Sequence, residues 1–173
     1  NGDDLTLESL AGDLEIGGAI DLSADEGVDL IVEGGFNTTI EGVISGEGAV
    51  LIKRDDGVLT LRGNNTHDGG TRLEGGTIVL GHNEALGSSK LVVAGDGALQ
   101  SGSNKRIIDN KISIDAGNTL TISGAKRLRM DGKISGEGAL EFAFDEDDVT
   151  LRVTGKNTYS GGTTFPRGTP ILG

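Results

Sequence analysis

Apolar and polar residues alternate in short runs along much of the chain. In "VLTLR" the apolar Leu59 and Leu61 fall on one face of the run, and in "KISID" Ile112 and Ile114 do the same. A period of two is typical of β-strands, whereas an amphipathic helix repeats every 3.6 residues. The runs recur about every 8–12 residues and are bounded by Gly, Asn and Asp, as in all-β proteins. The pattern therefore predicts short strands along the whole chain.

The sequence also repeats itself at long range. "IEGVISGEGAVLI", which begins at Ile40, returns 90 positions later as "MDGKISGEGALEF", which begins at Met130. A second block returns 92 positions later. In that block Gly63, Asn65, Thr66, Gly69, Gly70 and Thr71 return as Gly155, Asn157, Thr158, Gly161, Gly162 and Thr163.

Two all-β architectures fit the short strands. A β-sandwich would use hairpins and antiparallel pairs, and it needs no long internal repeat. A β-solenoid stacks parallel strands from successive coils. The offset of 90–92 residues divides into four coils of roughly 22 residues, which is within the range of solenoid repeats. We therefore predict a parallel β-helix of roughly seven to eight coils.

The apolar residues of these runs are the predicted core. Leu120 and Ile122 alternate in "TLTIS", and Leu151 and Val153 alternate in "TLRV". Val, Ile and Leu with few aromatic rings suit thin, regular layers. The predicted core positions are Leu59, Leu61, Val79, Leu91, Val93, Ile112, Ile114, Leu120 and Ile122.

Composition narrows the class of protein. The 173 residues include 31 Gly without a three-residue period, which excludes collagen, and only 2 Pro. No residue is Cys, so disulfides, thiolate metal sites and a cysteine nucleophile are excluded. No apolar run reaches the roughly 18 residues of a membrane helix. The chain begins at Asn1 and ends within a repeat, from which we expect a segment of a longer protein.

Charge is distributed unevenly along the chain. The net charge is −12, and residues 1–52 contain twelve acids and no Lys or Arg. An acidic protein repels a phosphate backbone, so nucleic acid is not an expected partner. The stretch Lys105–Lys133 is basic but lacks aromatic residues for base stacking, and we interpret it as a solvated face. If the protein self-associates through surfaces near residues 1–52, the acidic ends repel each other and association should strengthen as salt rises. Association that weakens with salt would instead indicate that the stretch Lys105–Lys133 pairs with the acidic residues.

One stretch, Ile44–Gly87, carries a family resemblance. Its marks are a Gly-Glu-Gly turn, a Leu-Thr-Leu strand, an Asn-Thr pair and two Gly-Gly-Thr turns. It resembles the passenger-associated repeat of autotransporters, also called the autotransporter-associated β-strand repeat. A decayed second copy covers Ile134–Gly173. The marks are Gly46–Gly48, Leu59–Leu61, Asn65–Thr66, Gly69–Thr71, Gly75–Thr77 and Ala85–Gly87.

The resemblance implies a fold, a location and partners. It implies a right-handed parallel β-helix that is secreted, or displayed on the cell surface, through the outer membrane of a Gram-negative bacterium. Residues 1–173 would form one β-helix segment of a larger passenger, with repeat copies at about 40–87 and 130–173. The parent chain would carry a C-terminal β-barrel translocator.

The expected function is that of a structural stem. The faces of its stacked coils would serve adhesion or self-association, with host or bacterial surface components or a second copy as partners, and the segment would aid passenger folding. The alternative is a carbohydrate-active β-helix lyase or hydrolase, since paired carboxylates hydrolyse glycosides. Because the acids are scattered among turns, we predict no enzymatic activity within these residues.

We predict no catalytic, metal or cofactor residue. His67 and His82 are the only histidines, and neither has a Cys or His at ligand spacing. His67 occupies the position of Tyr159 in the other copy, so we interpret it as a filler on the surface of a turn. The acid cluster Asp145–Asp148 and the pair Asp55–Asp56 could offer oxygens to calcium, but they lack the glycine pattern of a calcium loop. Both are predicted to be solvated loop tips.

Three asparagines leave two alternatives open. Asn64, Asn65 and Asn157 could belong to an asparagine ladder, in which amide side chains tie stacked coils together. They could equally be isolated turn residues.

Overall fold

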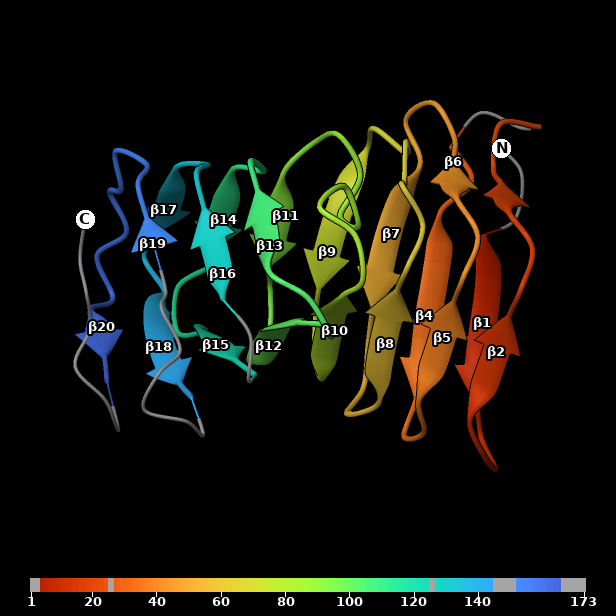
Figure 1. Ribbon diagram of the computed structural model, residues 1–173, viewed down its shortest axis with the longest axis horizontal. Helices are drawn as coiled ribbons and strands as arrows, with labels where there is room; N and C mark the ends of the chain where they lie inside the picture. Colours follow the sequence, from red (N-terminus) through yellow and green to blue (C-terminus); the bar gives the residue numbers. More distant parts are fainter. Residues whose placement is uncertain (1–3, 25–26, 125–126, 145–151, 166–173) are drawn as a thin grey trace.

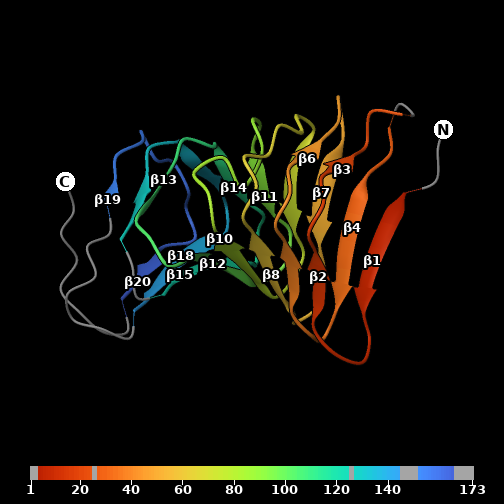
Figure 2. The same ribbon diagram turned by 45° about the vertical axis from the view of Figure 1, so that its right-hand side comes forward.

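The protein is a stack of parallel coils. The computed structural model describes residues 4–24, 27–124, 127–144 and 152–165, and every strand pair within them is parallel. About seven coils follow one another along a single axis, from β1 at one end to β20 at the other (Figure 1, Figure 2). The described residues contain no helix. The parallel β-solenoid is therefore confirmed, and the β-sandwich is excluded.

Two long sheets form the main faces. The seven-stranded sheet has the order β1-β4-β7-β9-β11-β14-β17. The eight-stranded sheet has the order β2-β5-β8-β10-β12-β15-β18-β20. The first consists of β1 (Leu5–Ser9), β4 (Leu30–Gly34), β7 (Val50–Lys53), β9 (Gly70–Leu73), β11 (Leu91–Val93), β14 (Ile112–Ile114) and β17 (Ile134–Gly136). The second consists of β2 (Leu14–Ile16), β5 (Thr38–Ile40), β8 (Val58–Leu61), β10 (Thr77–Leu80), β12 (Gly97–Ser101), β15 (Thr119–Ser123), β18 (Ala139–Ala143) and β20 (Thr163–Thr164).

A third face is interrupted. It consists of one two-stranded sheet, β3-β6, and one three-stranded sheet, β13-β16-β19. Between them, residues 62–69 and 81–90 contain no strand, so the two middle coils close with irregular segments. The strands are β3 (Ile20–Asp21), β6 (Ile44–Ser45), β13 (Arg106–Ile108), β16 (Leu128–Met130) and β19 (Arg152–Val153).

Coil length agrees with the repeat offset. Leu30 pairs with Leu5, 25 positions away, whereas Leu91 pairs with Thr71, only 20 positions away. Gly63 and Gly155 lie in coils that are four apart in the stack, as the offset predicts.

Inward-pointing side chains of successive coils stack into a continuous core. Because side chains alternate across a strand, each coil sends every second residue inward. Of the nine predicted core residues, eight are confirmed, each at most 1% exposed. They are Leu59, Leu61, Leu91, Val93, Ile112, Ile114, Leu120 and Ile122.

The prediction for Val79 is wrong. Ile78 pairs with the buried Leu59, and Ile78 and Leu80 are both fully buried. Val79 lies between them and therefore points outward, where it is only partly buried. In "TIVL" three apolar residues follow one another, so the local pattern leaves the phase undetermined and the register with β8 sets it.

The second glycine of the turn Gly69–Gly70 cannot be replaced without strain. Gly70 has φ of 104°, and its counterpart Gly162 has φ of 92°. Side chains disfavour this region, and a Cβ on Gly70 would lie 2.7 Å from the carbonyl oxygen of Lys90 in the next coil. The turn therefore depends on glycine both for its backbone conformation and for the close approach of the next coil.

Candidate functional site

Asn65 ties its own coil to both neighbours. Its Oδ1 accepts a hydrogen bond from the backbone N–H of Ile44 in the preceding coil (2.9 Å), and its Nδ2 donates to the carbonyl of Ala85 in the next coil (2.7 Å). In the second copy, Asn157 Oδ1 accepts from the N–H of Ile134 (2.8 Å). The repeated asparagine therefore makes the same bond to the preceding coil in both copies.

Neither alternative proposed for the asparagines is correct as stated. Asn64 is exposed, whereas Asn65 is only 3% exposed. The bonds of Asn65 and Asn157 go to backbone groups of adjacent coils, not to asparagines stacked above and below. These side chains thus connect coils, unlike isolated turn residues, but they do not form a ladder of amides.

Aspartates in the turns make similar bonds between coils. Asp13 Oδ1 accepts from the N–H of Asn37 (3.1 Å), and Asp96 Oδ1 accepts from the N–H of Thr119 (2.7 Å). Asp55 is exposed at its turn, as predicted, but its Oδ2 accepts from the N–H of Gly34 (3.0 Å). A carboxylate that accepts such bonds satisfies backbone groups that the short strands leave unpaired. The other predicted acid cluster, Asp145–Asp148, lies outside the described residues.

His67 is buried, so its interpretation as a surface filler is wrong. It is 0% exposed. Its Nε2 lies 3.2 Å from Thr71 Oγ1, which itself donates to the carbonyl of Leu86 (2.9 Å). Because the threonine proton goes to Leu86, the His67 Nε2 carries the proton of their shared bond. Tyr159 and Thr163 form the equivalent pair in the second copy, with Oη and Oγ1 2.6 Å apart.

The cover over His67 comes from the next coil. The irregular segment 81–90 brings Gly87 against the ring, and a Cβ on Gly87 would lie 2.7 Å from His67 Nε2. Within the described residues, Nδ1 is the only buried side-chain nitrogen or oxygen without a hydrogen-bond partner. Burial lowers the pKa of the His67 ring, and the nearby backbone of Ile44 and the charge of Asp68 act in the opposite direction. The ring is therefore held neutral.

Lys53 is a buried charge that the analysis of the sequence missed. It is 2% exposed, and in the register it stands between Val32 and Leu73. Its Nζ donates to the carbonyls of Arg54 and of Asp55, the latter at 2.8 Å. Burial lowers its pKa, and the nearby carboxylates of Asp55 and Asp56 oppose that shift. The alternation of "VLIK" could have revealed it, because Lys53 is in phase with the core residue Leu51.

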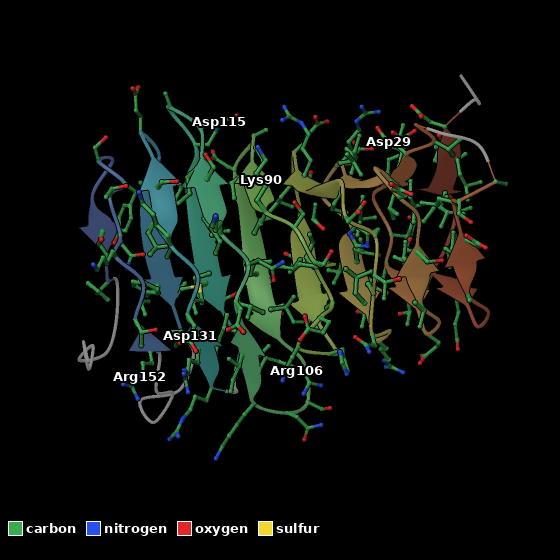
Figure 3. The ribbon with its side chains drawn as sticks, turned by 90° about the horizontal axis from the view of Figure 1, so that it is seen from above. Asp29, Lys90, Arg106, Asp115, Asp131 and Arg152 are labelled. Atoms are coloured by element: carbon green, nitrogen blue, oxygen red, sulfur yellow. The ribbon has the colours of Figure 1, made fainter. Side chains whose placement is uncertain are left out.

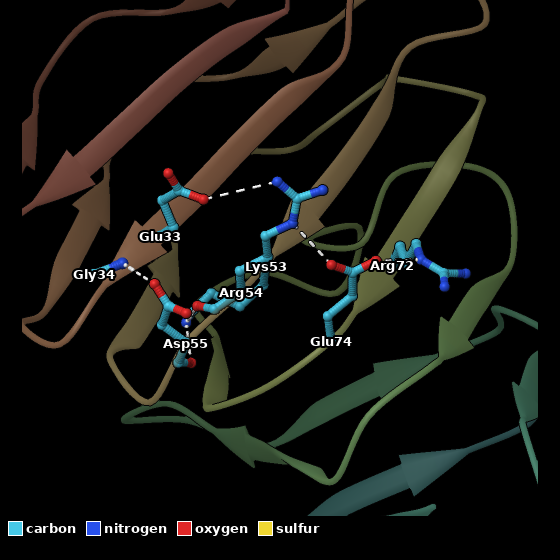
Figure 4. Close-up of polar contacts among 7 residues, drawn as sticks. All are labelled: Glu33, Gly34, Lys53, Arg54, Asp55, Arg72 and Glu74. Carbon is cyan, nitrogen blue, oxygen red and sulfur yellow. Dashed lines mark hydrogen bonds and ion pairs between the residues drawn. The ribbon is translucent and has the colours of Figure 1, made fainter.

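A ladder of ion pairs crosses the outer surface beside Lys53. Arg54 Nε lies 2.8 Å from Glu74, and its guanidinium lies 3.7 Å from Glu33 (Figure 4). Arg72 Nε lies 2.6 Å from the other oxygen of Glu74. Hydrogen bonds from Arg72 and Arg54 lower the pKa of Glu74. The ladder connects β4, β7 and β9 on the outer side of the seven-stranded sheet.

The outer surface of the eight-stranded sheet has a different character. From β5 to β15 its outward positions carry no charged side chain. Thr39, Thr60, Val79 and Gln100 stand in register on four successive strands. The outward residues are Thr39, Val58, Thr60, Thr77, Val79, Ala98, Gln100, Thr119, Thr121 and Ser123.

The basic stretch Lys105–Lys133 is only partly the solvated face we predicted. Arg106 donates through Nε to the carbonyl of Leu80 (3.0 Å), so it fastens one coil to the preceding one. Arg129 pairs with Asp131 through its Nε (2.7 Å) and lowers the pKa of that carboxylate. Lys105 is exposed.

Two open grooves lie on the surface. One, of about 420 Å³, is lined by Glu84, Lys90, Asp109 and Lys111, among others. The second, of about 560 Å³, contains Arg62 and Arg106 and no acid. Among the described residues no group of three or more His, Asp or Glu side chains could hold a metal ion. Nor does the described part of the chain contain a helix that could cross a membrane.

Comparisons with known proteins agree with this architecture. The passenger-associated-transport-repeat family matches residues 51–80 and 150–169. The chain is 33% identical over 149 residues to the adhesin BmaC autotransporter of Brucella suis biovar 1 (strain 1330). That alignment covers 80% of this chain but only 4% of the relative. No solved structure matches the chain significantly.

The matched segments coincide with the parts that connect the coils. Residues 51–80 include Lys53, Asn65 and His67, and residues 150–169 include the counterparts Asn157 and Tyr159. Proteins of this kind are secreted or displayed on the surface of Gram-negative bacteria by type V secretion, and this location applies to the chain. With its parallel coils and two copies of the repeat, the chain belongs to the autotransporter passenger-repeat proteins.

Proposed function

We propose that this segment is a structural stem whose exposed faces serve adhesion or self-association. The uncharged outer surface of the eight-stranded sheet carries the proposal. It extends without interruption from β5 to β15, and its Thr, Val, Ala, Gln and Ser side chains cost little to dehydrate compared with ionised groups. The related passenger from Brucella suis is named an adhesin, which supports the same assignment and a non-enzymatic role.

Beads that carry the purified segment test this proposal. Their adhesion to epithelial cells and their clumping are counted separately for the original protein, for Thr60→Lys and for Ser113→Lys. Thr60 lies in the uncharged surface, and Ser113 has a comparable outward, partly buried position on the seven-stranded sheet. A charge that must be buried without a partner weakens contact, so we expect Thr60→Lys to lower adhesion roughly tenfold.

The control should leave adhesion unchanged, because Ser113→Lys adds the same charge to the other sheet. Equal adhesion of all three proteins would remove the eight-stranded surface from the proposal. Failure of the original segment to adhere would overturn the adhesive role itself.

We propose in addition that the segment supports passenger folding during secretion. Solenoids fold by nucleation in one set of stable coils and propagation to their neighbours. The coils around residues 44–87 combine a continuous apolar core with side-chain bonds to both adjacent coils. They are therefore the proposed nucleus.

A further inference from the structure

A row of charged residues follows one corner of the solenoid. The register partners of the seven-stranded sheet stack on one another, so the residues that precede them stack as well. Backbone bonds support this, since Leu5 N donates to Asp29 O (2.9 Å) and Leu91 N donates to Lys111 O (2.8 Å). From one end of the molecule to the other, this corner row consists of Asp4, Asp29, Val50, Gly70, Lys90, Lys111 and Lys133.

The charges of the corner row are sorted by sign. Two acids come first, two uncharged residues occupy the middle, and three lysines follow. Figure 3 shows Asp29 and Lys90 at the same edge of the stack. In the described part of the chain none of the three lysines forms an ion pair. All three are exposed.

Within the described residues the three lysines form no direct ion pair, although Glu84 and Asp109 line the same groove as Lys90 and Lys111. Neighbouring coils are separated by about 4.8 Å, so like charges in the row repel one another. Arg54, Arg62, Arg72 and Arg129, by contrast, are paired with carboxylates. At the acidic end, Asp4 Oδ1 accepts from the N–H of Asp29, and Asp29 Oδ1 accepts from the N–H of Val50.

The sorted row is complementary to itself when one copy is turned end over end. With a two-fold axis between Val50 and Gly70, Asp29 meets Lys90 of the second copy and Asp4 meets Lys111 of the second copy. Symmetry repeats each contact, which gives four charge pairs. At the axis, Gly70 is buried and Val50 is partly buried, so no charged side chain of the row opposes its own copy there. Residues 1–52 add further acids and no base to the acidic end.

We propose that the corner row joins two copies of this chain in an antiparallel dimer. The dimer rests on the proposed function in one respect, because it specifies the surface through which the segment would self-associate. The acidic half and the basic half of the row lie on one chain and match each other about a single two-fold axis. This complementarity favours a second copy of the chain over any other partner. A sulfated polysaccharide could also follow the lysines, but it would give no role to the acidic half of the row.

Sedimentation of the purified segment at increasing salt tests the dimer. We expect dimers at about 30 mM salt and weaker association at about 500 mM salt, because salt screens charge pairs. The double variant Lys90→Glu, Lys111→Glu should raise the dimer Kd at least tenfold, about 1.4 kcal/mol. Lys105 lies directly before β13 and outside the corner row. Lys105→Glu makes the same change of charge at one residue and should therefore leave the Kd of the dimer unchanged.

A charge swap makes the test specific. The variant Asp4→Lys, Asp29→Lys should not self-associate, but mixing it with Lys90→Glu, Lys111→Glu should restore a dimer. The variant Asp4→Asn, Asp29→Asn keeps the side-chain hydrogen-bond acceptors, so it should fold even if the lysine substitutions at these positions do not. Because it removes both negative charges, it should weaken the dimer.

Three results would overturn the proposal. They are a monomer at every salt concentration, a dimer that strengthens with salt, and a dimer that the glutamate variant leaves intact. Retention on a heparin column that depends on Lys90 and Lys111, by a protein that stays monomeric, would assign the row to a polyanion instead. Thr60→Lys separates this proposal from the adhesive one, since it should lower adhesion and leave the dimer intact.

Discussion

Two titratable side chains, Lys53 and His67, are buried in the interior, and their hydrogen-bonding groups are satisfied to different degrees. Lys53 reaches carbonyl groups at the end of β7, so its ammonium is hydrogen-bonded although it is buried. His67 satisfies one ring nitrogen through Thr71 and leaves the other without a partner. A buried imidazole of this kind is stable only in its neutral form, because a protonated ring would carry an unpaired charge.

His67 therefore makes stability depend on pH. Its pKa is lowered in the folded protein, so between about pH 7 and pH 5 the unfolded chain, with a histidine pKa of about 6.5, binds more protons. The free energy of unfolding should fall as the pH drops below about 6.5, by at most about 1.4 kcal/mol per pH unit. Urea unfolding at a series of pH values measures this change.

Substitution of the histidine isolates its contribution. His67→Gln keeps an N–H donor for Thr71 but does not titrate, so its stability should change less over the same pH range. His82→Gln replaces the other histidine, which lies in the segment 81–90 outside the core, and should retain the full dependence. Identical pH profiles for the original protein and His67→Gln would contradict the assignment.

At the scale of single residues, alternation predicted the core well and failed where its phase or its meaning was ambiguous. Leu59 and Leu61 were predictable because a polar residue separates them, whereas Val79 stands among apolar neighbours. Lys53 was overlooked because a charged residue is not expected at an inward-pointing position of a strand. His67 was misjudged because its cover, Gly87, comes from 20 positions further along the chain, and no local pattern reports that contact.

At the scale of elements, the repeat motif functions as a connection between coils. The side chain of Asn65 satisfies a backbone donor on one side and a backbone acceptor on the other. Asn65→Ala would leave both groups buried without partners, which costs about 1–3 kcal/mol for each group. We expect a total loss of roughly 2–6 kcal/mol in the free energy of unfolding, measured by urea titration.

The neighbouring residue provides the control. Asn64 is exposed, so Asn64→Ala should change stability by less than about 0.5 kcal/mol. Asn157→Ala should cost less than Asn65→Ala, because Asn157 is exposed although it makes the equivalent bond. Equal stability of Asn64→Ala and Asn65→Ala would refute the role of Asn65 in connecting the coils.

The strands and the coil period were accessible from the sequence, but the interrupted third face was not. Period-two runs and the 90–92 offset depend on local spacing, which the sequence displays directly. Residues 62–69 and 81–90 are polar and glycine-rich, so they resemble exposed turns. They nevertheless enclose Asn65, Ala85 and Leu86, because stacking between coils replaces the missing strands.

At the scale of the whole molecule, we expect stability without a metal ion. The stack is stabilised by its core and by bonds between coils, and the described residues offer no cluster of ligands. Thermal unfolding should be the same with calcium and with a chelator. A site saturated one hundred-fold above its Kd would add about 2.7 kcal/mol. A shift of that size that disappears when Asp145–Asp148 are replaced would show that those acids bind calcium.

The proposed role in folding makes a prediction for the full-length protein. Leu61 is fully buried and stands in register between Ile40 and Leu80, so Leu61→Asp would bury an unpaired charge in the proposed nucleus. It should cost at least about 3 kcal/mol. Asp55→Asn lies only a few residues away, keeps an acceptor for Gly34 and tolerates the φ of 54° found there, so it should cost little.

Surface display distinguishes a folding nucleus from a passive spacer. Both variants are placed in the full-length protein, and the folded, protease-resistant passenger on the cell surface is quantified. Because a solenoid propagates from its stable coils, Leu61→Asp should reduce folded passenger well beyond this segment, whereas Asp55→Asn should be displayed normally. If Leu61→Asp destabilises the purified segment and is still displayed as efficiently as Asp55→Asn, folding begins elsewhere in the passenger and these coils only extend the stem.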